Sequence, residues 1–141
     1  MPVIASAIKF AGGSLPKVIS PDGHAVADYA TAGLFFLGAA LFWKRSKRAA
    51  VASIICGAAE TAVATLTDYP GGIKHVISFP LHRKIDFGLS SMAATMPEFL
   101  AFEEDKEKAF FRMQSAMIAG VTALTEFEPQ RIHGERERRA A

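Results

Sequence analysis

The stretch VISFPLHRKID, residues 76–86, has a counterpart earlier in the chain, VISPDGHAVAD, residues 18–28. Both begin with Val-Ile-Ser, both place an aspartate four residues after a histidine, and they lie 58 residues apart (76 minus 18). The same offset carries Thr67-Asp68-Tyr69 onto Thr125-Glu126-Phe127. Similarity at one fixed offset indicates an internal duplication. We therefore predict two tandem units that contribute equivalent ionisable residues.

The composition favours helices that cross a membrane. Half of the residues are apolar, the mean hydropathy is positive, and the charged residues are clustered. Between Ala49 and Leu66 the only ionisable side chains are those of Cys56 and Glu60. Apolar segments of about 18–20 residues can span the hydrocarbon core, and these segments lack the polar stripe of a soluble helix. We predict an all-α integral membrane protein, with an unusually apolar soluble four-helix bundle as the alternative.

Charge and cysteine content exclude several other classes of protein. The net charge is only +2, and the basic residues form no continuous helical face with interleaved aromatic residues. We therefore expect no nucleic-acid partner. One cysteine, Cys56, excludes an intramolecular disulfide and a cysteine-based metal site. We interpret it as a small packing residue.

Proline, glycine and short charged turns divide the chain into its predicted parts. Helices are expected at about residues 21–43, 48–68, 80–102 and 109–127. The predicted fold is an integral membrane four-helix bundle made of two tandem helical hairpins. Its parts are an interfacial N-terminal arm (1–20), a first repeat of two transmembrane helices (21–69), a connector (70–79), a second such repeat (80–128) and a charged tail (129–141).

The repeat predicts a cluster of ionisable residues at one end of the bundle. Two spans per repeat place both repeats in the same sense across the membrane. A histidine and an aspartate four residues apart also share one helix face. Imidazole and carboxylate ligands suit zinc, iron or manganese, and such a cluster could instead hold protons. The predicted site comprises His24, Asp28, Asp68, His82, Asp86 and Glu126.

Two other interpretations of this cluster stay open. The histidines and carboxylates could form hydrogen bonds that only staple neighbouring helices together. Alternatively, His24 and His82 could bind a haem from opposite faces, although nearby carboxylates make an apolar haem pocket less natural.

Three further polar residues lie in apolar segments. Glu60 falls where the other repeat has Ile118. A charge at this depth is costly, so we expect Glu60 to be protonated or paired. Glu98, near the opposite end of the third helix, is expected to pair with Arg112.

Several of these residues together resemble a family, the small bacterial membrane proteins with SPW repeats. The resemblance covers about residues 18–127, and in its Ser-Pro-Trp position this chain has Met96-Pro97-Glu98. It implies a four-helix protein of the bacterial inner membrane, and it supplies no activity or cofactor. The matching residues are Thr67-Asp68-Tyr69, Gly72, Ile77, His82 and Asp86, with His24 and Asp28-Tyr29 in the first repeat.

Three classes of function follow. The first is a protein that binds a divalent metal or protons at the membrane interface. The second is a structural or accessory subunit, in a homo-oligomer or a larger complex within the lipid bilayer. The third is a metal-dependent hydrolase or oxidoreductase that uses a metal-activated water. The basic turn at residues 44–48 favours a cytoplasmic location for that turn and hence a periplasmic site.

Overall fold

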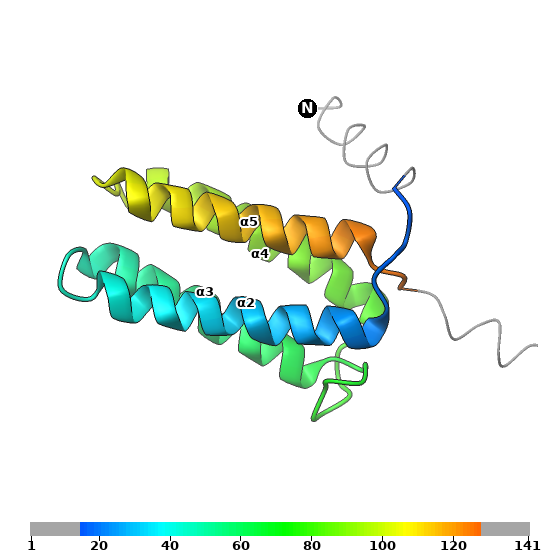
Figure 1. Ribbon diagram of the computed structural model, residues 1–141. Helices are drawn as coiled ribbons and strands as arrows, with labels where there is room; N and C mark the ends of the chain where they lie inside the picture. Colours follow the sequence, from blue (N-terminus) through cyan, green and yellow to red (C-terminus); the bar gives the residue numbers. More distant parts are fainter. Residues whose placement is uncertain (1–14, 128–141) are drawn as a thin grey trace, which may run out of the picture.

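The computed structural model describes residues 15–127 and, within them, shows four α-helices arranged as two antiparallel hairpins (Figure 1). Helix α2 packs along α3, and α4 packs along α5; further contacts join α2 to α5 and α3 to α4. Helices α2 and α4 therefore lie diagonally across the bundle axis, as do α3 and α5. The predicted all-helical, four-helix architecture is confirmed. The helices are α2 (Pro21–Phe42), α3 (Lys47–Leu66), α4 (Phe79–Phe99) and α5 (Asp105–Leu124).

Helices α2 and α4 begin with the same local structure. Ser20 caps α2 by accepting a hydrogen bond from the backbone N–H of Gly23 at 3.2 Å. Ser78 caps α4 by accepting one from Leu81 at 3.3 Å. In each helix a proline follows in the first turn, where its missing N–H costs nothing. These matched caps set where the histidine of each repeat lies.

Extended backbone closes the bundle at this same end. Short parallel bridges join Ile19 to Thr125 and Thr67 to Ile77. The amide of Ile19 donates to the Leu124 carbonyl at 3.0 Å, and that of Ile77 donates to the Leu66 carbonyl at 2.9 Å. The two bridges correspond to each other, because Ile19 and Ile77 are 58 positions apart and so are Thr67 and Thr125. Each bridge includes a threonine at the end of a helix.

Gly72 is required by the connector between α3 and α4. Its amide donates to the Tyr69 carbonyl at 3.0 Å. A Cβ at this position would collide with the carbonyl oxygen of Thr67. A larger residue would therefore displace the backbone that carries Thr67.

Some helix ends differ from the predicted ones. Helix α4 ends at Phe99 rather than near residue 102, and α5 begins at Asp105 rather than near residue 109. Ala101 has a φ of 48°, a left-handed conformation that cannot continue a helix. Most of the predicted N-terminal arm (residues 1–14) and the whole predicted tail (129–141) lie outside the described residues.

Two of the four described helices, α2 and α3, are long and apolar enough to cross a membrane. Helix α5 carries Asp105 and Glu107 in its first turn, and α4 carries Arg83 and Lys84 in its second. Buried helices of soluble bundles can have the same length and composition. Large apolar side chains are nevertheless exposed on α2 and α3, among them Phe36, Leu37, Leu41, Val51, Ile54 and Ile55.

Candidate metal centre

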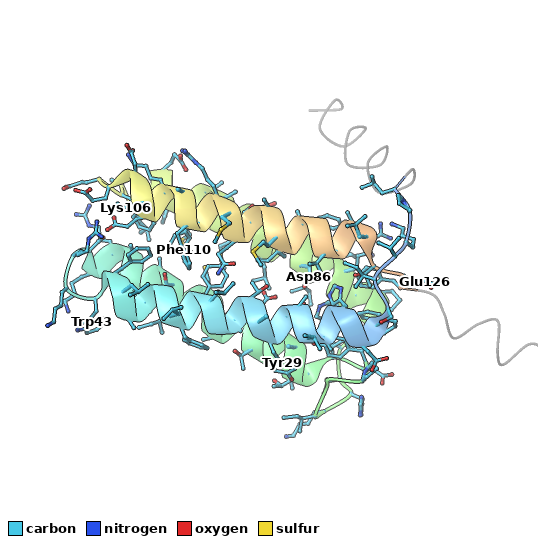
Figure 2. All side chains as sticks on the ribbon, in the orientation of Figure 1. Tyr29, Trp43, Asp86, Lys106, Phe110 and Glu126 are labelled. Atoms are coloured by element: carbon cyan, nitrogen blue, oxygen red, sulfur yellow. The ribbon has the colours of Figure 1, made fainter. Side chains whose placement is uncertain are left out.

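Four ionisable side chains meet inside one end of the bundle. His24 and Asp28 come from α2, and His82 and Asp86 come from the diagonal helix α4. One ligand atom from each of the four lies within 4.8 Å of the others, and the exposed fraction of each residue is 4% or less. Figure 2 shows Asp86 between the hairpins, near the end that carries Glu126 and far from Trp43 and Lys106. The predicted convergence is therefore confirmed for these four residues, which we call the His/Asp cluster.

The Nε2 atoms of the two histidines face each other at the centre of the cluster, 3.1 Å apart. His24 Nε2 lies 3.3 Å from Asp28 Oδ1 and 3.1 Å from Asp86 Oδ2. His82 Nε2 lies 3.2 Å from Asp28 Oδ2 and 3.0 Å from Asp86 Oδ1. Although Asp86 Oδ1 is this close, its contact lacks hydrogen-bond geometry. Each imidazole Nε2 thus contacts one oxygen of both aspartates.

Two threonines determine which ring nitrogen carries the proton. Thr67 Oγ1 lies 2.6 Å from the Val63 carbonyl and 2.7 Å from His82 Nδ1. A hydroxyl has one proton. Because the carbonyl can only accept, Thr67 donates to Val63 and accepts from the Nδ1–H of His82. Nε2 of a neutral His82 therefore presents a lone pair to the cluster.

The second histidine is held in the same way. Thr125 Oγ1 lies 2.6 Å from the Val121 carbonyl and 2.7 Å from His24 Nδ1. His24 Nδ1–H must therefore donate to Thr125, and its Nε2 also presents a lone pair. With both histidines neutral, the centre contains only acceptors and two negative charges. A metal ion or an added proton would compensate this charge, since an unpaired buried charge is very costly.

The aspartates receive different hydrogen bonds from outside the cluster. The Tyr69 hydroxyl donates to Asp28 Oδ2 at 2.8 Å. Burial, and then the charge of Asp28, raise the pKa of the Tyr69 phenol, so this hydroxyl keeps its proton. The Thr122 hydroxyl lies 3.1 Å from Asp86 Oδ2, but it also lies 2.7 Å from the Ile118 carbonyl. Asp28 is therefore held more firmly than Asp86.

Aromatic rings cover the cluster at its own end of the bundle. The rings of Phe79 and Phe127 contact each other at 4.5 Å between centroids. Both lie edge-on to His24, at 5.5 and 5.3 Å. Tyr69 packs against His82 at 5.3 Å. These rings give the cluster an apolar outer wall.

Asp68 and Glu126, two of the six predicted site residues, do not join the cluster. Asp68 is exposed and pairs with His75 at 2.9 Å, and Glu126 is exposed as well. The physical reason is the extended backbone that follows α3 and α5, because successive side chains of extended backbone point in opposite directions. The preceding threonine of each repeat faces the histidine, so the acid faces outward.

Sequence reasoning missed the threonines and Tyr69 as functional residues. The signal was present, because Thr67 and Thr125 recur at the same offset as the histidines. The Thr-Asp-Tyr motif draws attention to its acid, but the hydroxyl groups of Thr67 and Tyr69 on either side make the contacts with His82 and Asp28. Thr122 has no counterpart in the first repeat, where residue 64 is alanine, and no repeat signal could have found it.

The other predicted polar residues lie outside the cluster. Glu60 is buried in α3, and one of its carboxylate oxygens has no hydrogen-bonding partner among the described residues. Glu98 and Arg112 form the predicted ion pair at 2.9 Å, but both side chains are exposed to more than half of their extent. That pair connects α4 to α5 at the surface.

The arrangement fits a metal ion better than a haem. In a tetrahedral site with metal–nitrogen distances of 2.0–2.1 Å, the ligand atoms are separated by roughly 3.3–3.4 Å. In the cluster the two histidine nitrogens are 3.1 Å apart, and each lies 3.0–3.3 Å from one oxygen of both aspartates. The two histidines contact different oxygens of each aspartate, and one ligand atom from each residue lies within 4.8 Å of the others. A haem would have to fit its porphyrin between His24 Nε2 and His82 Nε2, and a gap of 3.1 Å leaves no room for it.

No protein-family model, curated protein or solved structure matches this chain.

Proposed function

We propose that the chain binds one divalent metal ion through His24, Asp28, His82 and Asp86, inside a small membrane-embedded four-helix bundle. The observation that carries the proposal is the pair of hydrogen bonds to Thr67 and Thr125, which turn both Nε2 lone pairs toward the two carboxylates. Two neutral imidazoles and two carboxylates carry a charge of −2, which a divalent ion neutralises. Metal-binding histidines commonly donate their other N–H to an oxygen in this way.

The mixture of nitrogen and oxygen ligands suits zinc, and iron and manganese accept the same ligands. A resident ion would join α2 to α4 across the bundle axis. Because all four ligands are buried, a substrate could not reach this ion without rearrangement of the helices. The burial therefore favours a structural or storage role for the metal over catalysis.

Metal analysis tests the proposal directly. Protein purified without chelators should contain about one divalent ion per chain. After the metal is removed, added zinc should raise thermal stability, by about 2.7 kcal/mol at a concentration 100 times Kd. Protein that contains no stoichiometric metal and gains no stability from zinc, manganese or iron would contradict the proposal.

The second candidate is a metal-free staple of hydrogen bonds, which would suit an accessory subunit of a membrane complex. The contacts that favour it are the His–Asp separations, since 3.0–3.3 Å is also hydrogen-bond length. One histidine would then have to be an imidazolium that donates from both nitrogens. In this case, substitutions in the cluster should cost the same stability with and without a chelator.

The membrane location is part of the proposal. The exposed apolar side chains of α2 and α3 would face lipid, as would Trp43, which lies next to the basic turn with Lys47 3.6 Å above its ring. Tryptophan at this position is typical of a membrane interface. The positive-inside rule then puts the turn at residues 44–48 in the cytoplasm and the cluster on the periplasmic side. Labelling of a Ser46→Cys variant only from the outside would contradict this orientation.

We also propose that the two hairpins arose by duplication, as in the SPW-repeat proteins that the chain resembles. Matched caps, bridges and histidine–threonine bonds at an offset of 58 support this origin. Superposition of α2–α3 on α4–α5 in an experimental structure should bring His24 onto His82 and Asp28 onto Asp86. A best superposition in another register would contradict it.

A further inference from the structure

Beyond the cluster, the bundle interior contains four buried polar side chains that lack partners. Among the described residues, no hydrogen bond is made by Ser53 Oγ, by either amide atom of Gln114, by either carboxylate oxygen of Glu107, or by Oε2 of Glu60. Each of these residues is 3% exposed or less. Buried polar groups are nearly always hydrogen-bonded, so these four, which we call the polar file, need water or an ion.

The depth of each member follows from the two threonines that bind the histidines. Helices α3 and α5 run in the same direction, and Thr67 and Thr125 both lie at the level of the cluster. Glu60 and Ser53 precede Thr67 by 7 and 14 residues, and Gln114 and Glu107 precede Thr125 by 11 and 18. At a rise of 1.5 Å per residue, Glu60, Gln114, Ser53 and Glu107 lie about 10, 16, 21 and 27 Å below the threonines.

The polar file alternates between two helices. Glu60 and Ser53 belong to α3, and Gln114 and Glu107 belong to α5, which lies diagonally across the axis. Measured along the bundle axis, the steps between successive members are about 5–6 Å, and water molecules between the two helices would link side chains at this spacing. A similar step leads from Glu60 to the level of Thr122, which contacts Asp86. The polar file therefore extends from the cluster to the opposite end of the bundle.

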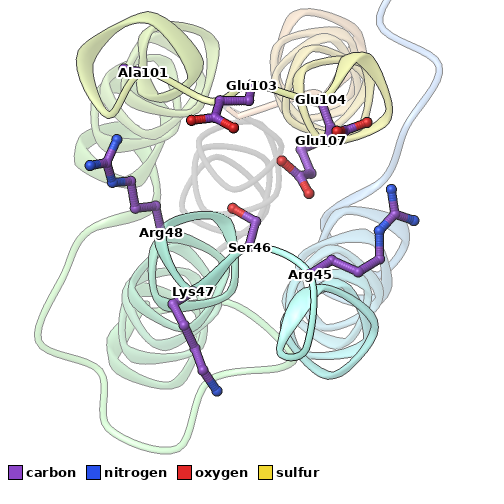
Figure 3. A pocket seen from close by; sticks show the side chains of 8 residues that line it. All are labelled: Arg45, Ser46, Lys47, Arg48, Ala101, Glu103, Glu104 and Glu107. Atoms are coloured by element: carbon purple, nitrogen blue, oxygen red, sulfur yellow. The ribbon is translucent and has the colours of Figure 1, made fainter.

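At that opposite end the polar file meets an open pocket of about 310 Å³ between the two hairpin turns. Ser46, Glu103, Glu104 and Glu107 line it together with basic residues of the turn. Figure 3 shows the side chains of Ser46 and Glu107 directed into its centre, while Lys47 points away from it. Three carboxylates and three basic side chains line this mouth, so its formal charge is balanced, but the Glu107 carboxylate lies toward its centre while Lys47 points away.

The two ends of the bundle thus differ in access. The cluster is covered at its own end by the rings of Phe79 and Phe127, whereas the far end opens into the pocket. We propose that the polar file is a hydrated path along which water and small divalent cations move between the pocket and the His/Asp cluster. Its role as a route for the metal rests on the proposed function, and its hydration does not.

Thiol labelling tests the hydration without any metal. In a Cys56→Ala background, Ser53→Cys places a thiol in the polar file. Ala52→Cys is the matched control, because Ala52 is also 0% exposed, lies at the same depth as Ser53 and packs in the hydrophobic core on another side of α3. A small, water-soluble, cationic methanethiosulfonate should modify Ser53→Cys at least about tenfold faster than Ala52→Cys, because modification requires access of the reagent. Equal rates in two variants with unchanged thermal melts would overturn the path.

Zinc uptake by metal-free protein tests the route. Gln114→Leu should slow uptake by about tenfold, the effect of a barrier raised by one unmade hydrogen bond, with the final zinc content unchanged. Entry past the aromatic rings predicts the reverse, in that Phe127→Ala accelerates uptake and Gln114→Leu leaves it unchanged. That result would overturn the route. Protein that takes up no zinc would refute the proposed metal site, and the labelling contrast would still decide whether the path is hydrated.

Discussion

Hairpin α2–α3 and hairpin α4–α5 each supply one histidine, one aspartate and one threonine to the centre, at positions 58 apart. The hairpins differ in the groups that donate hydrogen bonds to the two aspartates. Asp28 accepts from Tyr69, whose counterpart Phe127 has no hydroxyl, and Asp86 lies near Thr122 instead. Both histidines thus share one tautomer, whereas the two carboxylates are supported from different directions.

The equivalence of the two histidines predicts the largest effect. His24→Ala and His82→Ala each remove one of four ligands and leave a threonine hydroxyl without its partner. Each variant should lose most of the stabilisation that metal gives, about 2.7 kcal/mol at 100 times Kd, and the two losses should be similar. Thermal melts with and without zinc measure this. A loss confined to one histidine would show that the hairpins do not contribute equally.

The unequal support of the aspartates predicts the next effect. Tyr69→Phe removes the 2.8 Å hydrogen bond to Asp28 and should weaken zinc binding by about 10- to 100-fold. Thr122→Val should weaken it less, because the Thr122 hydroxyl is shared with the Ile118 carbonyl. Competition titrations against a chelating dye give both affinities. A larger effect of Thr122→Val would show that Thr122 supports Asp86 more firmly than Tyr69 supports Asp28.

The sequence predicted the four residues of the His/Asp cluster but not their surroundings. The repeat and the four-residue spacing of histidine and aspartate were sufficient, because both features determine which helix face and which end a side chain occupies. Asp68 and Glu126 were misplaced because their location depends on where α3 and α5 end. A shift of one residue in extended backbone exchanges the inward and outward side chains.

The helices themselves were predictable to within a few residues, since proline, glycine and charged turns bound them. The order of the helices around the axis was not, because it depends on contacts between hairpins. That order brings α2 and α4 into diagonal positions and so joins the two histidines across the axis. The capping serines were equally hard to select, as their role depends on the extended segments that pair at the ends of α3 and α5.

The two hairpins also differ deeper in the bundle, where α3 has Glu60 and the equivalent position of α5 is Ile118. Glu60→Gln keeps the size and the hydrogen-bonding groups and should change the free energy of unfolding little. Glu60→Ala should cost about 1–3 kcal/mol, because the groups or water that Glu60 binds lose their partner. Denaturant titrations measure both values. Equal tolerance of the two substitutions would mean that Glu60 has no partner to lose.

Asp68 and Glu126 should give the smallest effect, because they occupy equivalent exposed positions outside the cluster. Asp68→Asn and Glu126→Gln should leave zinc affinity unchanged and alter the free energy of unfolding by less than about 0.5 kcal/mol. Isothermal titration with zinc and a denaturant titration check both statements. A loss of zinc binding in either variant would show that the substituted acid is a zinc ligand.

X-ray absorption of the zinc-loaded protein tests the central claim most directly. If His24 and His82 both bind through Nε2 and the two aspartates complete the set, the first shell should contain about four nitrogen or oxygen atoms at 2.0–2.2 Å. Outer-shell scattering should then correspond to two imidazole rings. A spectrum without imidazole scattering, or with a sulfur ligand from Cys56, would contradict the proposed centre.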